Sequence, residues 1–426
     1  MQQMRTHLAD DVGATARTEP AAVRPSDGRL PDALAMPVRG EILPCRAIRF
    51  SELTPQDMAA WSRLGTRATH GNIFATPWMM AAGLRHCDRK NQVRLFVVTD
   101  VYGEWVGVMP LVHRASFGRL PSKNWHGWIH DNQFLNAPLV AAGYEHGFWR
   151  SILKALDDRD ETAFALTCSM MIEDDHVIKG LYSACADDDR RFDITGETKR
   201  PMLHSKFSFE RYWSTTVTKK RQDRLGRLAA QLENDYGPAQ IEFMRDPAGG
   251  NEWARQFLAL EQKGWRGKSG EALANDSRTE DYFRDVVTHG LATGTLQLMS
   301  LRTGDRICAM YAYFLTPGYG FGFKMVVDEE FAAFAPTTML LREVTKLLDG
   351  PHPILFDSGA QPGQQPVSSV WMDRRRLIDI SVELNGNGAP YGTVMGIRSL
   401  WYRLKAKFKP KRRRHGGERR RKRRSD

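Results

Sequence analysis

The chain has 426 residues, 42% of them hydrophobic, so it exceeds one typical domain and can form two packed cores. No run approaches the roughly 18 apolar residues that predict a membrane span, and the first residues lack the apolar core of a signal peptide. The five cysteines are scattered without a Cys-x-x-Cys pair, which argues against a zinc site or a disulfide framework. These features favour a cytoplasmic protein.

The net charge of +11 comes from one segment of the chain. Of the 61 Lys and Arg residues, 14 lie in residues 403–426, which hold only two acidic residues. The rest of the chain has a balance of −1, so the folded part carries no net positive field. We expect residues 1–44, which contain Ala, Pro, Asp and Arg without periodicity, to form a disordered leader. Residues 410–426 are expected to form a disordered polybasic tail.

A first domain is expected over residues 45–205. Two strands are expected at residues 95–98 and 105–112, followed by a loop rich in aromatic residues and histidine at 125–134. The segment 137–140 comes next, and a helix is expected at 148–156. Tyr102-Gly103 between the first two strands is typical of a hairpin turn. His126 and His130 in the loop are four residues apart, but the surrounding Trp, Gly and Asn residues favour a loop that packs or rims a groove. We therefore expect no metal site.

A second domain is expected over residues 206–385, beginning with a long helix at 209–234. Its leucines recur at i, i+3 and i+7, and Ser208 is placed to cap its start. Five basic residues lie on its other faces: Lys219, Lys220, Arg221, Arg224 and Arg227. Two interpretations of these stay open, a solvated helix surface or a rim that contacts an anionic substrate.

The second domain continues with alternating helices and strands. Expected are a helix through Trp253 and Phe257, a helix at 280–291, strands at 295–301, 307–315 and 319–327, a helix at 336–348 and a strand at 354–356. The loop 328–335 opens a helix beside a sheet, where unpaired N–H groups and the helix dipole favour an anion such as a coenzyme diphosphate. The predicted fold class is α+β, with mixed, mostly antiparallel sheets flanked by helices.

An amphipathic helix is expected at residues 386–409. Its apolar stripe comprises Ile397, Leu400, Trp401, Leu404 and Phe408, and basic clusters follow at 411–414 and 419–424. One interpretation is a helix docked on the second domain with a solvated tail. Another is an anchor on an anionic membrane surface, which would make the protein peripheral at the inner face of the membrane. Nucleic acid contact is the least favoured, because no aromatic residues accompany the two clusters.

Several motifs in order carry a family resemblance. They are residues 209–213 (Phe-Glu-Arg-Tyr-Trp), 260–265 (Leu-Glu-Gln-Lys-Gly-Trp), 324–328, 336–341 and 357–359 (Asp-Ser-Gly). With them the second domain resembles the GNAT-superfamily acyltransferase domain of CelD-type cellulose-biosynthesis proteins and, more distantly, FemAB-type aminoacyl transferases. The first domain resembles the family's N-terminal half at Asn72, Phe74, Pro77, Trp78, Gly107, Pro110 and Pro138-Leu139. The resemblance implies tandem GNAT-like domains.

The resemblance also implies an activity. It implies transfer of an acyl group, most simply acetyl from acetyl-CoA, to an amine or hydroxyl of a sugar, polysaccharide precursor or envelope metabolite. This chemistry needs both reactants in one groove, a general base and backbone donors for the thioester carbonyl, but no covalent nucleophile. Two alternatives stay open. The basic helix and tail keep an aminoacyl-tRNA donor open, and Thr337, where the family commonly has glycine, favours a catalytically degenerate scaffold.

The candidate site residues fall into three groups. The catalytic candidates are Asp328, Asp357 and Glu261; the coenzyme candidates are the amides of Phe334, Ala335, Thr337, Thr338 and Met339; the substrate candidates are Lys263, Trp265 and Lys324. Asp328 could deprotonate an acceptor or simply bond its own backbone in a turn. Lys324 shares a strand face with Asp328 and could bind an anionic group or pair with it. Trp265 alone is more typical of a packing anchor.

Overall fold

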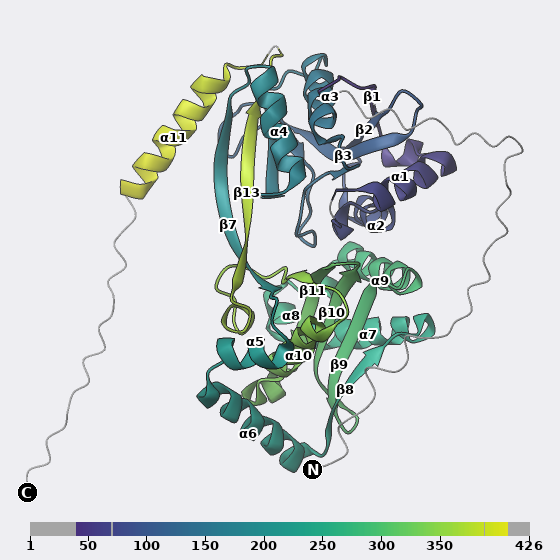
Figure 1. The fold of residues 1–426 in the computed structure, drawn as a ribbon, viewed down its shortest axis with the longest axis vertical. Coiled ribbons are helices and arrows are strands. Elements are labelled where there is room, and N and C mark those ends of the chain that lie inside the picture. Colours follow the sequence, from purple (N-terminus) through teal and green to yellow (C-terminus); the bar gives the residue numbers. More distant parts are fainter. Residues whose placement is uncertain (1–39, 70, 387, 408–426) are drawn as a thin grey trace, which may run out of the picture. The chain divides into compact units, whose positions relative to one another are not determined.

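The computed structural model describes residues 40–69, 71–386 and 388–407. Most of the expected leader, 1–44, and all of the expected tail, 410–426, lie outside the described residues. The described elements build one mixed sheet of 13 strands with helices packed against it (Figure 1). The predicted α+β fold class with a mostly antiparallel sheet flanked by helices is confirmed. Within the described residues, no helix is long and apolar enough to cross a membrane.

The strands follow one path through the sheet. They are β1 (Cys45–Ile48), β2 (Arg94–Thr99), β3 (Trp105–Arg114), β4 (Asn124–Gly127), β5 (Leu139–Val140), β6 (Ala165–Ile172), β7 (Phe192–His204), β8 (Ala239–Met244), β9 (Leu296–Thr303), β10 (Arg306–Thr316), β11 (Tyr319–Val327), β12 (Leu355–Asp357) and β13 (Asp373–Glu383). Their order is β1-β2-β3-β4-β6-β13-β7-β12-β11-β10-β9-β8, and β5 pairs with β3.

All helices but the last lie between strands in the chain, and the last follows β13. The helices are α1 (Pro55–Arg67), α2 (Pro77–Cys87), α3 (Glu145–Asp157), α4 (His176–Asp187), α5 (Phe209–Thr216), α6 (Lys219–Tyr236), α7 (Pro247–Lys263), α8 (Trp265–Ser269), α9 (Ser277–Ala292), α10 (Pro336–Thr345) and α11 (Tyr391–Lys407). A 3₁₀ helix, η4 (Glu329–Phe334), occupies most of the loop expected at 328–335.

The two halves of the sheet repeat one topology. Each half begins with a strand and its helices, followed by three antiparallel strands. A helix comes next, and then a strand that runs parallel to the last of those three strands. The parallel pair is β4 with β6 in the first half and β11 with β12 in the second. The repeat agrees with the expected tandem arrangement of two GNAT-like units.

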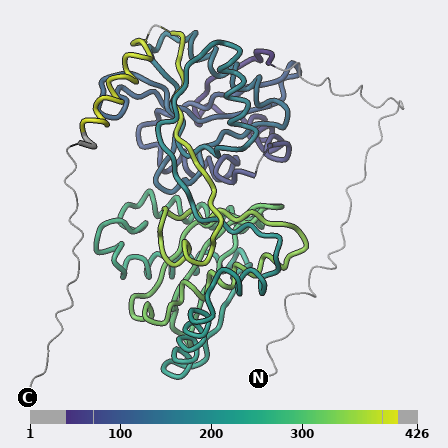
Figure 2. The backbone as a smooth tube through the Cα atoms, turned by 60° about the vertical axis from the view of Figure 1, so that its left-hand side comes forward, coloured from purple at the N-terminus to yellow at the C-terminus, as the bar shows by residue number. Residues whose placement is uncertain are grey.

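Two long strands are exchanged between the halves. Strand β7 of the first half pairs with β12 of the second, and β13, which comes late in the chain, pairs with β6 of the first. The two strands also pair with each other, residues 373–382 opposite 192–202, and run side by side in Figure 2. The segment expected as the second domain, 206–385, therefore contributes β13 to the sheet of the first half.

The predicted helix at 209–234 is wrong as a single helix, because α5 ends at Thr216 and α6 begins at Lys219. Thr216, Val217 and Thr218 at the break are β-branched, and such side chains lose rotamer freedom in a helix. Ser208 occupies the N-cap position of α5 but makes no side-chain cap hydrogen bond. Instead, the Phe209 N–H donates to Asp349 Oδ1 at 2.7 Å.

Aromatic side chains from both halves share one hydrophobic cluster. Phe74 of the first half contacts Phe314 and Phe321 of the second edge-on, with ring centroids 6.2 Å apart in each pair. Helices α2 and α9 pack together at this cluster, which also buries Tyr282. Fully burying a Phe side chain contributes about 1.5–3 kcal/mol. This cluster holds the halves together independently of the strand exchange.

Strands β11 and β12 separate after three paired residues. Residues Tyr319–Phe321 pair with Leu355–Asp357, while β11 continues to Val327 without a strand partner on that side. On its other side a β-bulge leaves Phe323 as the extra residue opposite β10, and a bulge bends and twists its strand. The two separating strands form a fork. At its base, a Cβ on Gly322 would lie 2.2 Å from the Ser358 carbonyl oxygen. The glycine thus lets the two chains approach where they begin to separate.

Gly322→Ala should destabilise the protein by about 1–3 kcal/mol, because the added methyl group collides with backbone. Urea unfolding of the full chain measures this loss. The matched control is Gly226→Ala in α6, where a Cβ meets no atom within 4 Å and alanine is expected to stabilise the helix slightly. Equal stability of wild type and Gly322→Ala would contradict the close approach at the fork.

Candidate active site

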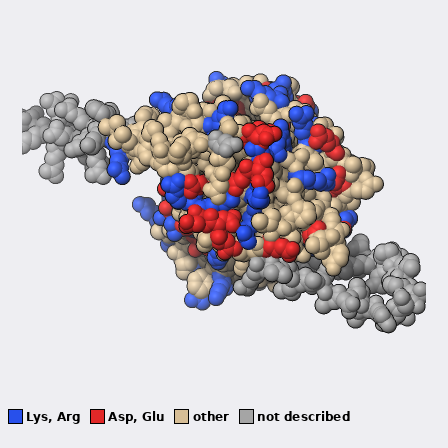
Figure 3. Space-filling model, turned by 90° about the horizontal axis from the view of Figure 1, so that it is seen from above, with Lys and Arg blue, Asp and Glu red and all other residues tan. Residues whose placement is uncertain are grey.

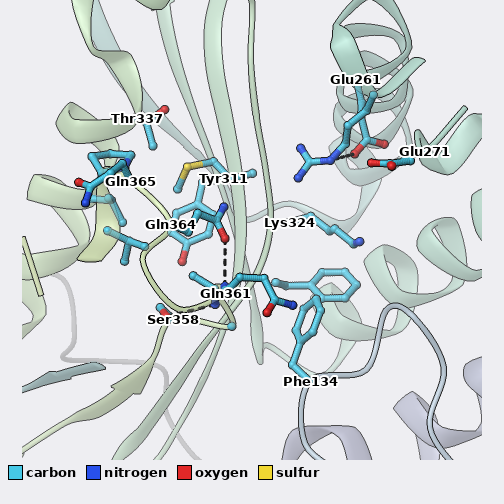
Figure 4. A pocket seen from close by; sticks show the side chains of 18 of the residues that line it. Phe134, Glu261, Glu271, Tyr311, Lys324, Thr337, Ser358, Gln361, Gln364 and Gln365 are labelled. Atoms are coloured by element: carbon cyan, nitrogen blue, oxygen red, sulfur yellow. Dashed lines mark hydrogen bonds and ion pairs between the residues drawn. The ribbon is translucent and has the colours of Figure 1, made fainter. Parts of the chain in front are cut away.

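A cleft of about 430 Å³ opens where β11 and β12 separate. Its walls come from β11, the first turns of α10, the loop after β12, the region of α7 and α8, and residues 131 and 134 of the first half. In Figure 4, Thr337 and Gln365 lie on one side of the cleft, and Glu261, Glu271 and Lys324 lie on the other. The two sides therefore differ in chemistry, one neutral beside a helix N-terminus and one rich in charge.

The N-terminus of α10 borders this cleft. Ala335 precedes it in the left-handed conformation (φ 57°), Pro336 takes the first helical position, and no side chain caps the helix among the described residues. The Thr338 and Met339 N–H groups both donate to the Ala335 carbonyl oxygen, and the Ala335 N–H donates to Ala332. Of the five residues with predicted amides, Thr337 is the one that lines this cleft.

Arginines from α6 lie next to the same helix N-terminus. Arg221 and Arg224 line a neighbouring hollow together with Ala335 and Thr338. Arg221 is fixed there because it donates to the carbonyl oxygen of Ser369 at 3.0 Å and to its hydroxyl at 2.7 Å. Two guanidinium groups thus add positive charge to the positive end of the α10 dipole. The other basic residues of α6 do not line this hollow.

Lys324 and Glu261 form the charged side of the cleft. The Lys324 ammonium donates to Asn132 Oδ1 at 2.6 Å and lies 5.9 Å from the ring centroids of Phe134 and Phe323. Burial lowers the pKa of Lys324 to about 8. Glu261 is almost fully buried, and one carboxylate oxygen accepts the Leu273 N–H at 2.8 Å. The other oxygen lies 3.9 Å from the Arg266 guanidinium.

Asp328 does not face this cleft and does not pair with Lys324. Its carboxylate accepts the Lys263 ammonium at 2.9 Å and the Glu330 N–H at 3.1 Å in a separate hollow. Burial opposes ionisation of Asp328, but these two hydrogen bonds outweigh it and hold the pKa of the carboxyl below its usual range. Asp328 is thus a paired, helix-starting residue in this structure, and a weak proton acceptor.

Three further candidates lie away from the cleft surface. Trp265 is 55% exposed, with the Arg266 guanidinium 4.8 Å from its ring centroid. Phe334 is buried in the core beneath α10, and Met339 packs partly against that core. Their positions suit packing rather than contact with a ligand in the cleft.

Asp357 lies at the base of the fork, fully buried. It pairs with Arg200 of β7 at 3.3 Å and Arg375 of β13 at 3.4 Å, and it accepts the Gly359 N–H at 2.9 Å. It does not line the cleft, whereas the loop that it holds, starting at Ser358, does. Its position is that of a residue that fixes the cleft wall to the exchanged strands.

The equivalent fork of the first half is closed by the protein itself. Strands β4 and β6 pair over only two residues before they separate. Asn136 then bridges them. Its side-chain amide donates to the Gly127 carbonyl oxygen at 3.0 Å, and its backbone N–H donates to the Met170 carbonyl oxygen at 3.4 Å. The open fork is therefore the one between β11 and β12.

Several residues of the cleft were not among the candidates. They are Asp131, Phe134, Arg266, Glu271, Tyr311, Gln361, Gln364 and Gln365. Tyr311 is fully enclosed, and burial raises the pKa of its hydroxyl far above the usual range, so it stays protonated. The three glutamines lie in the irregular loop after β12, where no periodic pattern signals a role. No group of three or more His, Cys, Asp or Glu in the described ranges is arranged to hold a metal ion.

Comparison with known proteins agrees with this geometry. Residues 219–348, which contain β11, α10 and the basic helix, match the family model described as an acetyltransferase (GNAT) domain. The second half of the chain thus contains a segment similar to a GNAT acetyltransferase domain, and this segment includes β11 and α10 beside the cleft. No curated protein sequence matches the chain.

Solved structures resemble the chain over both halves. A conserved protein of unknown function from Bacteroides thetaiotaomicron is 12% identical, with a TM-score of 0.51 over 81% of this chain and all of that one. At this identity the likeness concerns the fold alone. The chain is also similar to FemX, with 11% identity and a TM-score of 0.49 over 80% of this chain and 98% of that one. It is similar to L-PGS from Bacillus licheniformis as well, with 12% identity and a TM-score of 0.49 over 83% of this chain and 97% of that one.

Asp357→Asn should destabilise the protein by about 3–5 kcal/mol, because it leaves Arg200 and Arg375 buried without a counter-charge. Chemical unfolding measures the loss, and Glu104→Gln serves as the control. Glu104 pairs with Arg63 on the surface, so its replacement should cost about 1 kcal/mol or less. An Asp357→Asn variant as stable as wild type but inactive would instead indicate a catalytic carboxylate.

Lys324→Met should change how stability depends on pH. Between the folded pKa of about 8 and the ordinary value of 10.5, the unfolded chain holds the Lys324 proton and the folded chain does not. The contribution of this residue to stability therefore rises with pH across that window, and the methionine variant should lack this rise. Urea midpoints at both ends of the window test it. An identical pH dependence in both proteins would show that the pKa of Lys324 is not lowered.

Proposed function

We propose that the protein is an acyltransferase that takes an acyl group, most simply acetyl, from an acyl-CoA and transfers it to an amine or hydroxyl of a small-molecule or glycan acceptor. The observation that carries the proposal is the open fork between β11 and β12 beside the uncapped N-terminus of α10, where β11 and α10 belong to the residues that match the GNAT domain model. The acceptor would be sugar-related or envelope-related, as the resemblance to CelD-type proteins implies.

The acyl donor fits the neutral side of the cleft. Its diphosphate would lie at the α10 N-terminus, where the Thr337 N–H, the helix dipole and the nearby Arg221 and Arg224 favour negative charge. Its extended arm would follow the unpaired edge of β11, whose backbone groups beyond Phe321 can hydrogen bond to amides of the arm. Thr337 stands where the family commonly has glycine, and its hydroxyl offers one more donor to the anion.

The acceptor would enter from the charged side. An amine or hydroxyl there attacks the thioester carbonyl carbon, a C–N or C–O bond forms, and the C–S bond breaks to release the thiol of coenzyme A. Glu261 on the cleft wall is our candidate for taking the acceptor proton. Tyr311, which stays protonated at the base of the fork, is our candidate for donating a hydrogen bond to the leaving thiolate, which then takes up a proton from water. Lys324 would orient the acceptor.

A second donor remains as an alternative. The arginines beside α10 and the further basic residues of α6 would also suit the phosphates of an aminoacyl-tRNA. The volume of the cleft, about 430 Å³, is large enough for a thioester arm or an aminoacyl end. A non-catalytic scaffold would keep the fold but would need neither ligand.

Calorimetry with acetyl-CoA tests the proposal. The full chain should bind it at micromolar levels, and Thr337→Glu should weaken binding by at least about tenfold, because a carboxylate would face the diphosphate. Glutamate in the first helical turn complements the helix dipole, so this variant should fold normally. The matched control is Ala248→Glu, in the exposed first turn of α7, which should bind acetyl-CoA like wild type.

The other outcomes separate the alternatives. Failure to bind acetyl-CoA together with retention of aminoacyl-tRNA would overturn the acyl-CoA proposal in favour of the second donor. Binding of neither would favour the scaffold. Equal binding by wild type and Thr337→Glu would show that the diphosphate does not lie at α10.

A further inference from the structure

Helix α11 packs against the first half of the sheet with one face only. Tyr391 and Val394 are buried against Phe164, and the Tyr391 hydroxyl donates to the Ser381 carbonyl oxygen at 2.8 Å. One turn later the Arg398 guanidinium donates to the Thr195 carbonyl oxygen at 2.9 Å. Phe164 and Thr195 belong to the segment expected as the first domain and Ser381 to that expected as the second, but all three lie in the first half of the structure.

A second face of α11 is apolar and uncovered. Ile397, Leu400 and Leu404 follow at i, i+3 and i+7, so they form one stripe. They are 50%, 58% and 46% exposed. Val394 and Ile397 are three residues apart, so the stripe adjoins the packed face that holds Val394 and Arg398, and its side chains remain about half exposed. In Figure 3 the surface at the left, where α11 extends, is mostly uncharged.

Positive charge is concentrated next to this stripe. The sequence holds 14 basic and two acidic residues between 403 and 426. The rest of the chain has no such excess, and acidic and basic side chains are interspersed over the central part of the face shown in Figure 3. An apolar stripe on a helix, followed directly by clustered Lys and Arg, is the combination that binds anionic lipid surfaces.

We propose that Ile397, Leu400 and Leu404 of α11 bind the surface of an anionic lipid membrane, to which the positive charge in the sequence from residue 403 to residue 424 adds attraction. The stripe would enter the boundary between headgroups and acyl chains, and the basic side chains would contact the headgroups. A second copy of the chain is disfavoured as the occupant, because pairing two α11 stripes would bring two sets of about 12 net positive charges together. Nucleic acid would use the charges but leave the stripe exposed.

Vesicle co-sedimentation of the full chain tests this surface, and it needs no acyl donor, so its outcome is independent of the proposed function. Wild type should sediment with vesicles of phosphatidylcholine and phosphatidylglycerol but weakly with phosphatidylcholine alone. Replacing Ile397, Leu400 and Leu404 by serine should lower the partition coefficient by about tenfold or more. Val101→Ser/Tyr102→Ser, on an apolar hairpin turn that is more exposed than the stripe, is the control and should sediment like wild type.

Two further proteins complete the test. Leu400→Ser alone should show a smaller loss in the same direction, which keeps the test valid if the triple variant folds poorly. Deletion of residues 405–426 should remove the preference for anionic vesicles. Undiminished sedimentation of a folded triple variant, or equal binding of wild type to both vesicle types, would overturn the proposal. So would a wild-type dimer that becomes monomeric in the triple variant while neither protein binds vesicles.

Discussion

The buried carboxylate of Asp357 is the point at which three strands of this fold are joined. Arg200 comes from β7, Arg375 from β13 and Asp357 from β12. A carboxylate buried between two guanidinium groups is stable only while both partners stay in place, so the pairing favours one register of the exchanged strands. The same carboxylate accepts the Gly359 N–H and so positions the loop that forms one wall of the cleft. The ionic cluster thereby links the exchange of strands to the shape of the site.

The repeated topology gives two forks, and the chain uses them differently. Asn136 fills the fork between β4 and β6 with its own hydrogen bonds, which satisfies the backbone groups that separating strands leave unpaired. No side chain in the described residues caps α10 at the other fork, and a cleft lies there instead. An unpaired edge at this position carries a cost in stability that a ligand can offset. The asymmetry therefore supports a binding role for the second half and a supporting role for the first.

Long periodic segments were predictable from the sequence, and the centre of the sheet was not. The strands near 105–112 and 319–327 and the helices near 253 and 336 carry clear patterns, and the structure has β3, β11, α7 and α10 there. β7 was missed because the polar run from Thr195 to Arg200 gives no apolar alternation. β13 was missed although Ile378, Ile380 and Val382 do alternate with polar residues. Their partners lie about 180 residues apart in the chain, and no local signal reports such pairing. Glu261, Lys324 and Thr337 could be found from motifs, whereas Tyr311 and the glutamines reach the cleft only through the fold.

Lys324 shows why both halves are needed to build the cleft. It belongs to β11, but its ammonium is held by Asn132 from a loop of the first half, between Phe134 of the first half and Phe323 of the second. A ligand that enters this side must therefore contact side chains from two units that the shared cluster around Phe74 keeps at a fixed distance. Because these contacts cross between units, a second half expressed alone would keep the α10 N-terminus but lose the Asn132 partner and part of the charged side. The tandem arrangement is thus a property of the site as well as of the fold.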